Sequence, residues 1–108
     1  MFEEKFKEYN KVNKNVYSTF CKFAIEATNA GANATSGWLI INGMRWHSLL
    51  NDIISEDYKL PNDYIGVYTR AFALQYPQHK NLFRFKKTKR NLDELARWLV
   101  ENRETTQE

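Results

Sequence analysis

The sequence has little of what fixes a small protein covalently or interrupts its helices. Its 108 residues include one cysteine, two prolines and four glycines. The single thiol, Cys21, excludes an intramolecular disulfide and favours a reducing compartment. Every apolar run is shorter than the roughly 18 residues that a membrane span requires, and the charged first residues do not resemble a signal peptide. We therefore expect a cytoplasmic protein without a membrane segment.

Patterns typical of catalysis or metal binding are also missing. His47 and His79 stand far apart without cysteine or histidine at ligand spacing, whereas a structural zinc site needs about four ligands. The glycines are scattered and form no phosphate-binding loop. Cys21 lies among apolar residues of an expected helix, which favours a small buried side chain over a nucleophile. We expect neither an enzyme nor a bound metal or cofactor.

Acidic residues are absent from one long segment. Between residues 64 and 92 there are seven basic residues and no acidic one, a charge of +7. The rest of the chain holds nine basic and thirteen acidic residues, a charge of −4. The net charge of +3 therefore arises locally, and a segment of this kind favours an anionic partner.

Length and composition predict one globular domain. Hydrophobic residues make up 43% of the chain and aromatic residues 15%, which is enough for one core in a chain of this size. We assign residues 1–104 to the domain and expect residues 105–108 to form a disordered tail.

The first predicted helix covers residues 2–28, and its first dozen residues, rich in glutamate and lysine, are expected to form a solvated extension that frays. Small and polar residues then indicate a loop over 29–36, with Gly31 placed to stop the helix. Spacings of three and four define the apolar face of the helix: Val12, Val16, Phe20, Phe23 and Ala27.

The segment 37–55 allows two structures. Asn42-Gly43 between apolar runs is typical of a hairpin over 38–47, which would give an α+β fold. Continuity with the helical pattern that follows favours a helix instead, and we adopt it. The helix would place on one face Trp38, Asn42, Trp46, Leu49 and Ile53.

Three further elements follow. A helix over 62–76 begins after Pro61. Apolar and basic residues alternate over 82–87, which indicates a short edge strand. A last helix covers 91–103. The expected core includes Trp46, Leu49, Tyr68, Phe72 and Trp98.

These elements predict a mainly α-helical domain of about four helices with a small β element. A winged-helix or helix-turn-helix arrangement would pack 37–55 beneath 62–76 and use 82–90 as the wing. A single short strand needs a partner. The partner would come from 38–47, from residues near Pro61 or from a second subunit, so we also expect a homodimer.

The helix over 62–76 carries one cation on a narrow stripe of small residues. Gly66, Arg70 and Ala73 share this stripe, with Thr69 at its border. The planar guanidinium of Arg70 suits a phosphate or a guanine edge. The competing interpretation is close helix packing, with Arg70 paired to an acidic residue such as Asp63.

Residues 80–90, which we call the basic segment, give the clearer indication of a binding site. Two phenylalanines, Phe83 and Phe85, alternate with its cations and would anchor a strand while the cations point outward. Each phosphate neutralised by such cations releases counterions. The predicted phosphate-contacting residues are Lys80, Arg84, Lys86, Lys87, Lys89 and Arg90.

We therefore expect a non-catalytic nucleic-acid-binding regulatory protein, with duplex DNA as the partner. Thr69 and Arg70 would approach a groove, and the basic segment would contact phosphates. The alternative is a small inhibitor or adaptor that applies the same cations to an acidic protein surface.

Overall fold

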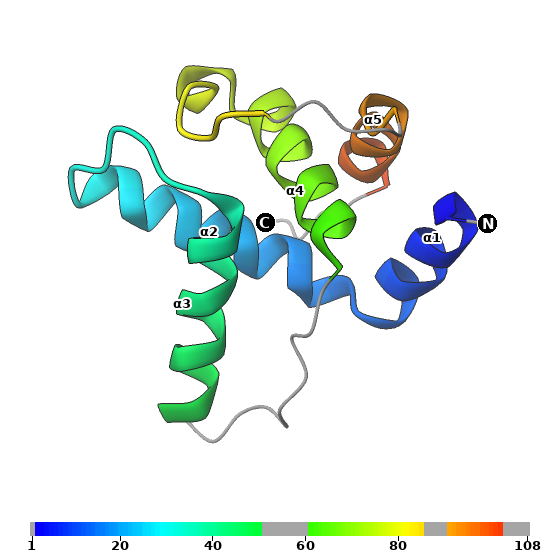
Figure 1. Cartoon of the computed structure of the whole chain (residues 1–108), viewed down its shortest axis with the longest axis horizontal. Coiled ribbons are helices and arrows are strands. Elements are labelled where there is room, and N and C mark those ends of the chain that lie inside the picture. The colour runs from blue at the N-terminus through cyan, green and yellow to red at the C-terminus, as the bar shows by residue number, and fades with distance from the viewer. Residues whose placement is uncertain (1, 51–60, 86–90, 103–108) are drawn as a thin grey trace.

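The protein is described by a computed structural model that covers residues 2–50, 61–85 and 91–102. Within these ranges the prediction of a mainly helical single domain is confirmed (Figure 1). The Cα radius of gyration of 13.3 Å fits one domain of about 100 residues. The elements are α1 Phe2–Val12, α2 Lys14–Asn29, α3 Gly37–Leu50, α4 Asn62–Gln75, η1 Pro77–His79 and α5 Asp93–Glu101. None of the described helices is both long and apolar enough to cross a membrane.

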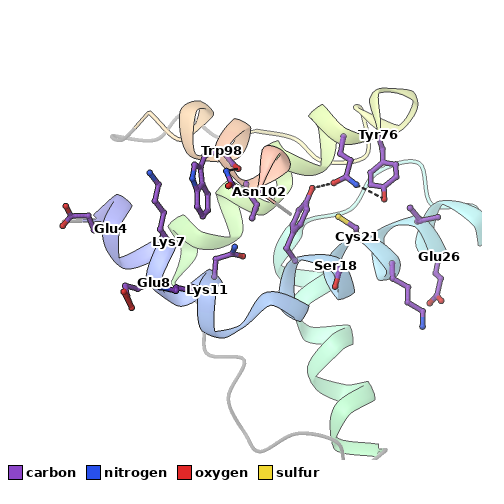
Figure 2. A pocket seen from close by; sticks show the side chains of 16 residues that line it. Glu4, Lys7, Glu8, Lys11, Ser18, Cys21, Glu26, Tyr76, Trp98 and Asn102 are labelled. Carbon is purple, nitrogen blue, oxygen red and sulfur yellow. Dashed lines mark hydrogen bonds between the residues drawn. The ribbon is translucent and has the colours of Figure 1, made fainter. Parts of the chain in front are cut away.

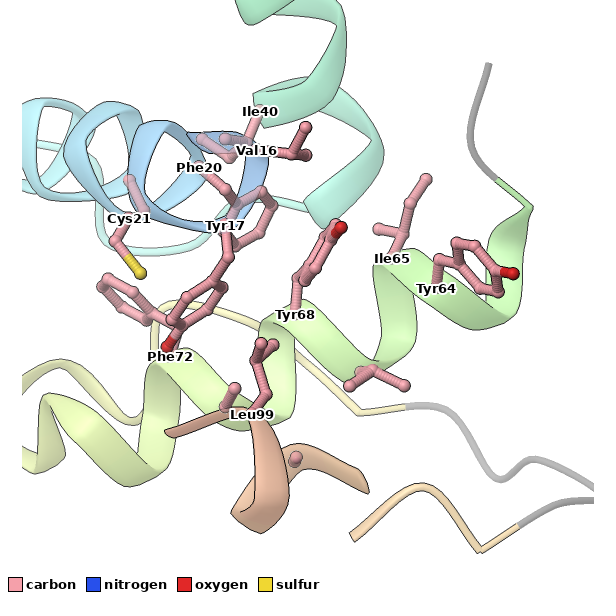
Figure 3. Packing of buried hydrophobic residues seen from close by; sticks show 14 of the residues in the cluster. Val16, Tyr17, Phe20, Cys21, Ile40, Tyr64, Ile65, Tyr68, Phe72 and Leu99 are labelled. Atoms are coloured by element: carbon pink, nitrogen blue, oxygen red, sulfur yellow. The ribbon is translucent and has the colours of Figure 1, made fainter. Parts of the chain in front are cut away.

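Helix α4 forms the centre of the domain. Its apolar residues cover nearly the whole circumference, so a stable fold must surround it with other helices. The ring of Tyr68 shows the result, because its centroid lies 5.6 Å from that of Phe20 in α2 (Figure 3). It also lies 5.9 Å from the ring centroid of Phe6 in α1. Helix α5 packs along another side of α4. The beginning of α3 crosses α4 near the beginning of α4 (Figure 1).

The predicted first helix is two helices. Asn13 leaves the helical conformation at φ −121° and ψ 56°, and its side-chain amide donates to the carbonyl of Tyr9 at 3.0 Å. Asparagine competes for backbone groups in this way, which weakens a helix interior. The expectation that the first dozen residues form a fraying, solvated extension is wrong, because α1 turns back and buries Phe6 completely. Val12, expected in the core, is 78% exposed at the corner.

The loop between α2 and α3 follows the prediction. Helix α2 ends at Asn29, and Gly31 adopts a φ of 104°, in the left-handed region that glycine tolerates best. The hydroxyl of Ser36 then accepts a hydrogen bond from the backbone N–H of Leu39 at 3.1 Å, in the manner of a helix cap.

Helix α3 confirms the helical alternative for 37–50, but its predicted core face is wrong. Ile40, Ile41 and Met44 are buried, whereas Trp38 and Trp46 are 49% and 62% exposed. The physical reason is the close crossing of α3 over α4. A Cβ on Gly37 would lie 2.5 Å from Cγ2 of Ile65, so the two backbones meet where no side chain intervenes. This crossing turns the aliphatic face inward and the tryptophans outward.

Of the other predicted core residues, some are fully buried, one is partly buried and one is not described. Tyr68 and Phe72 are fully buried, as predicted, and Trp98 is partly buried against the core. The side chain of Leu49 lies outside the described part. The helices at 62–75 and 93–101 confirm the predictions for 62–76 and 91–103 to within two residues at each end.

In place of the predicted strand, the structure has one isolated β-bridge within residues 2–50, 61–85 and 91–102. Thr35 and Phe83 pair in parallel, and the backbone N–H of Thr35 donates to the carbonyl of Leu82 at 2.9 Å. The pairing partner is thus the end of the α2–α3 loop and not one of the three candidates expected. A winged-helix arrangement gains no support from the described residues.

Candidate nucleic-acid interface

The small-residue stripe of α4 lies largely against α5, and its three residues are half-buried. Gly66 is covered by the residue that precedes α5, since a Cβ there would lie 2.8 Å from Cδ1 of Leu92. Thr69 is only 7% exposed, and its hydroxyl donates to the carbonyl of Gly66 at 3.0 Å. The expectation that this stripe is an exposed contact face is therefore wrong.

Arg70 is held by contacts within the protein. Its side chain is 14% exposed, and its Nε lies 3.6 Å from Oδ1 of Asp93 at the start of α5. Its Nη1 donates to the carbonyl of Gly66 at 3.1 Å, and its Cζ lies 5.2 Å from the centre of the Phe85 ring. These contacts match the competing interpretation, in which the arginine joins helices and pairs with an acidic residue.

The basic segment is exposed where it is described. Arg84 follows the β-bridge, Lys80 follows η1, and both side chains face solvent. Phe83 is buried, whereas Phe85 is half-exposed. The other four predicted phosphate-contacting residues lie outside the described residues, and in the sequence they follow directly on Phe85: Lys86, Lys87, Lys89 and Arg90.

Helix α3 presents an apolar face to solvent. Of the six large hydrophobic side chains most exposed in the described part, three belong to this helix: Trp38, Leu39 and Trp46. At 100° per residue these three positions and Asn42 fall within one-third of the helix circumference. The guanidinium of Arg45 lies 5.6 Å from the centre of the Trp38 ring at the edge of this face.

The fold brings the start of α3 and the basic segment together. A parallel bridge pairs Thr35, just before α3, with Phe83. The first residue of α3, Gly37, lies against Thr69 of α4, and the guanidinium of the next residue, Arg70, lies 5.2 Å from the centre of the Phe85 ring. The start of α3 and the described part of the basic segment are therefore neighbours.

We give one name, the aromatic–basic surface, to the exposed face of α3 and the exposed residues 80–85 taken together. It consists of Trp38, Leu39, Asn42, Arg45, Trp46, Lys80, Arg84 and Phe85.

The aromatic–basic surface is built from segments that contain no acidic residue. Besides residues 64–92, the stretch from 27 to 51 is free of aspartate and glutamate, and it contributes one further cation, Arg45. This second acid-free stretch was readable from the sequence but was not used in the prediction. Both stretches carry a net positive charge, which favours anionic partners.

A second concave region lies on another side of the molecule. A groove of about 1550 Å³ runs between α1, α2 and α5, with glutamates and lysines alternating along its α1 rim (Figure 2). Inside it, the hydroxyl of Tyr17 donates to Oε1 of Gln75 at 2.8 Å, and Nε2 of Gln75 donates to the hydroxyl of Tyr76 at 3.3 Å (Figure 2). The groove exceeds the roughly 300–1,000 Å³ of ordinary small-molecule pockets.

The groove offers no arrangement typical of catalysis. Cys21 on its wall is buried, as the sequence predicted. Across the described ranges no group of three histidine, cysteine, aspartate or glutamate residues is placed to hold a metal ion. The aromatic–basic surface is therefore the stronger candidate for a functional site.

Comparisons of this chain with protein-family models, with curated proteins and with solved structures found no match.

Proposed function

We propose that this protein binds nucleic acid without catalysing a reaction, and that the aromatic–basic surface is the contact region. One observation carries the proposal: two tryptophans with large exposed areas, and the exposed cations of the basic segment, lie on two stretches of the chain that contain no acidic residue. Cations neutralise phosphates, and aromatic rings stack on bases. The two features together therefore indicate nucleic-acid binding more strongly than either feature alone.

The basic segment supplies the phosphate contacts. Lys80 and Arg84 are exposed, and the four cations that follow in the sequence extend the basic run to residue 90. Contacts of this kind position a nucleic acid and depend on salt, but they do not read its sequence. Thr69 and Arg70 are left out of the proposed contact region because they are engaged inside the fold.

A second candidate function has one specific observation in its favour. The exposed face of α3 combines tryptophan, leucine and arginine without lysine, aspartate or glutamate. This composition is typical of the centres of protein–protein interfaces. The protein would then be a small inhibitor or adaptor for a partner with an acidic surface.

Charge reversal separates these functions. We expect Arg84→Glu and Lys80→Glu to weaken binding to labelled DNA or RNA, measured by fluorescence anisotropy, because each replaces an attraction to phosphate by a repulsion. Each lost phosphate contact should also lower the slope of log affinity against log salt by about 0.7–0.9.

Arg97→Glu is the matched control. Arg97 is an exposed arginine in α5, which lies away from α3 (Figure 1), and its replacement changes the net charge equally. Affinity should stay close to that of wild type apart from the general charge effect. Absence of binding to any nucleic acid at low salt contradicts the proposal and leaves the acidic protein partner. An equal loss in Arg97→Glu contradicts the location of the site.

A further inference from the structure

We infer that the nucleic acid bound by the aromatic–basic surface is single-stranded, with bases stacking on Trp38 and Trp46. This inference rests on the proposed function and specifies its substrate class. The starting observation is the burial of the three tryptophans. Trp98 packs against the core, whereas Trp38 and Trp46 expose 49% and 62% of their surface. Large aromatic side chains left in solvent on one helix face indicate a binding region.

Trp38 has a guanidinium close to its ring. The Cζ of Arg45 lies 5.6 Å from the centre of its ring, so an indole and a guanidinium lie together. These are the two kinds of side chain on which unpaired bases stack. The positive charge of Arg45 also attracts the phosphate of a nucleotide whose base reaches Trp38.

The spacing along α3 fits a strand that crosses the helix face. Trp38 and Trp46 are eight residues apart, so their Cα atoms are about 12 Å apart along the axis. That distance equals roughly three to four stacked nucleotides at about 3.4 Å each. Asn42 lies between the two tryptophans, and its amide can donate to and accept from a base edge.

A duplex fits the same face poorly. Base faces in a duplex are covered by their neighbours, so an indole can stack on them only after base pairs open. A helix that reads a groove presents mainly arginine, lysine, asparagine and glutamine to base edges. The exposed face of α3 has two indoles and a leucine for one arginine and one asparagine. Helix α4, the other candidate for a groove, is buried.

The test compares one labelled oligonucleotide as a single strand and as a duplex, by fluorescence anisotropy on the full chain. The variants are Trp46→Leu and Trp46→Phe, with the same pair at position 38. Leucine keeps an apolar side chain but has no ring, whereas phenylalanine keeps a ring. The control is Val12→Ala, which truncates an exposed apolar side chain at the α1–α2 corner. Melting curves verify that each variant is folded.

We expect the single strand to bind more tightly than the duplex. Each leucine variant should weaken single-strand binding by about 5- to 150-fold, each phenylalanine variant by less, and the control should equal wild type. Equal or tighter duplex binding, or equal losses for leucine and phenylalanine, overturns the inference while the proposed function stands. Absence of binding to both forms overturns the proposed function as well, and points to an acidic protein partner.

Discussion

Alanine substitutions at two glycines of α3 should change stability in opposite directions. At Gly37 an added Cβ would lie 2.5 Å from Cγ2 of Ile65 and 2.7 Å from Cγ2 of Thr69. Both neighbours are β-branched residues in a helix, so their side chains have little freedom to turn away. Helix α3 would have to move off α4, and overpacking of this kind costs about 1–3 kcal/mol.

At Gly43 the same substitution meets ordinary packing. The added Cβ would lie 3.7 Å from Cδ2 of Phe23, a normal contact distance. Gly43 is in the interior of α3, where alanine is more favourable than glycine by about 0.5–1 kcal/mol. Gly43→Ala should therefore stabilise the protein. In a hairpin with a type I′ turn at Asn42-Gly43, the position needs a positive φ and alanine would destabilise it.

Thermal unfolding followed by circular dichroism measures both effects. A domain of this size shifts its melting temperature by about 4–8 °C for each kcal/mol. We expect a fall of roughly 5–20 °C for Gly37→Ala and a rise of a few degrees for Gly43→Ala. A Gly37→Ala protein that melts at or above the wild-type temperature refutes the close crossing of α3 and α4. A lower melting temperature for Gly43→Ala refutes the helix at this position.

Three further substitutions test the packing. Phe72→Ala removes a fully buried ring that lies 5.5 Å from the Phe83 ring, and the free energy of unfolding should fall by about 3–5 kcal/mol in chemical denaturation. Phe6→Ala should lower it by a similar amount, because α1 is anchored by that ring; an unchanged value would mean that α1 does not pack. Arg70→Ala should lower it by about 1 kcal/mol, since the partner carboxylate of Asp93 is 73% exposed and well solvated. Nucleic-acid affinity in anisotropy should stay unchanged in this variant, and a marked loss would restore Arg70 to the contact surface.

Much of the helical framework could be predicted from local pattern. Helices α4 and α5 have apolar residues at helical spacing and clear start signals, such as Pro61 before α4. Gly31 marked the end of the helix before the loop, as observed. These features depend on neighbours in the sequence, so one sequence is enough to identify them.

The orientation of α3 could not be predicted in the same way. Periodicity treats Trp38 and Trp46 as apolar and assigns them to the core, but the contact at Gly37 decides which face turns inward. That contact depends on where α4 lies in space. The break at Asn13 was also hidden, because no glycine or proline marks it and it is fixed by a side-chain hydrogen bond to Tyr9.

The candidate site was predicted in part. The basic segment was evident from charge, and Lys80 and Arg84 are exposed as expected of contact residues. The stripe at Arg70 was misassigned because small residues serve helix packing and ligand approach equally well. Only the three-dimensional arrangement places Leu92 and Asp93 over that stripe.

The central claim is that nucleic acid binds at the aromatic–basic surface. The most direct measurement is a titration of ¹⁵N-labelled protein with a single-stranded oligonucleotide. The indole N–H signals of the tryptophans are followed in NMR spectra. The chain has three tryptophans, two on this surface and one, Trp98, in the groove beside α1. We predict that the signals of Trp38 and Trp46 shift or broaden while that of Trp98 stays in place. A shift confined to Trp98, or no shift of the Trp38 and Trp46 signals with the oligonucleotide in excess, would contradict the account.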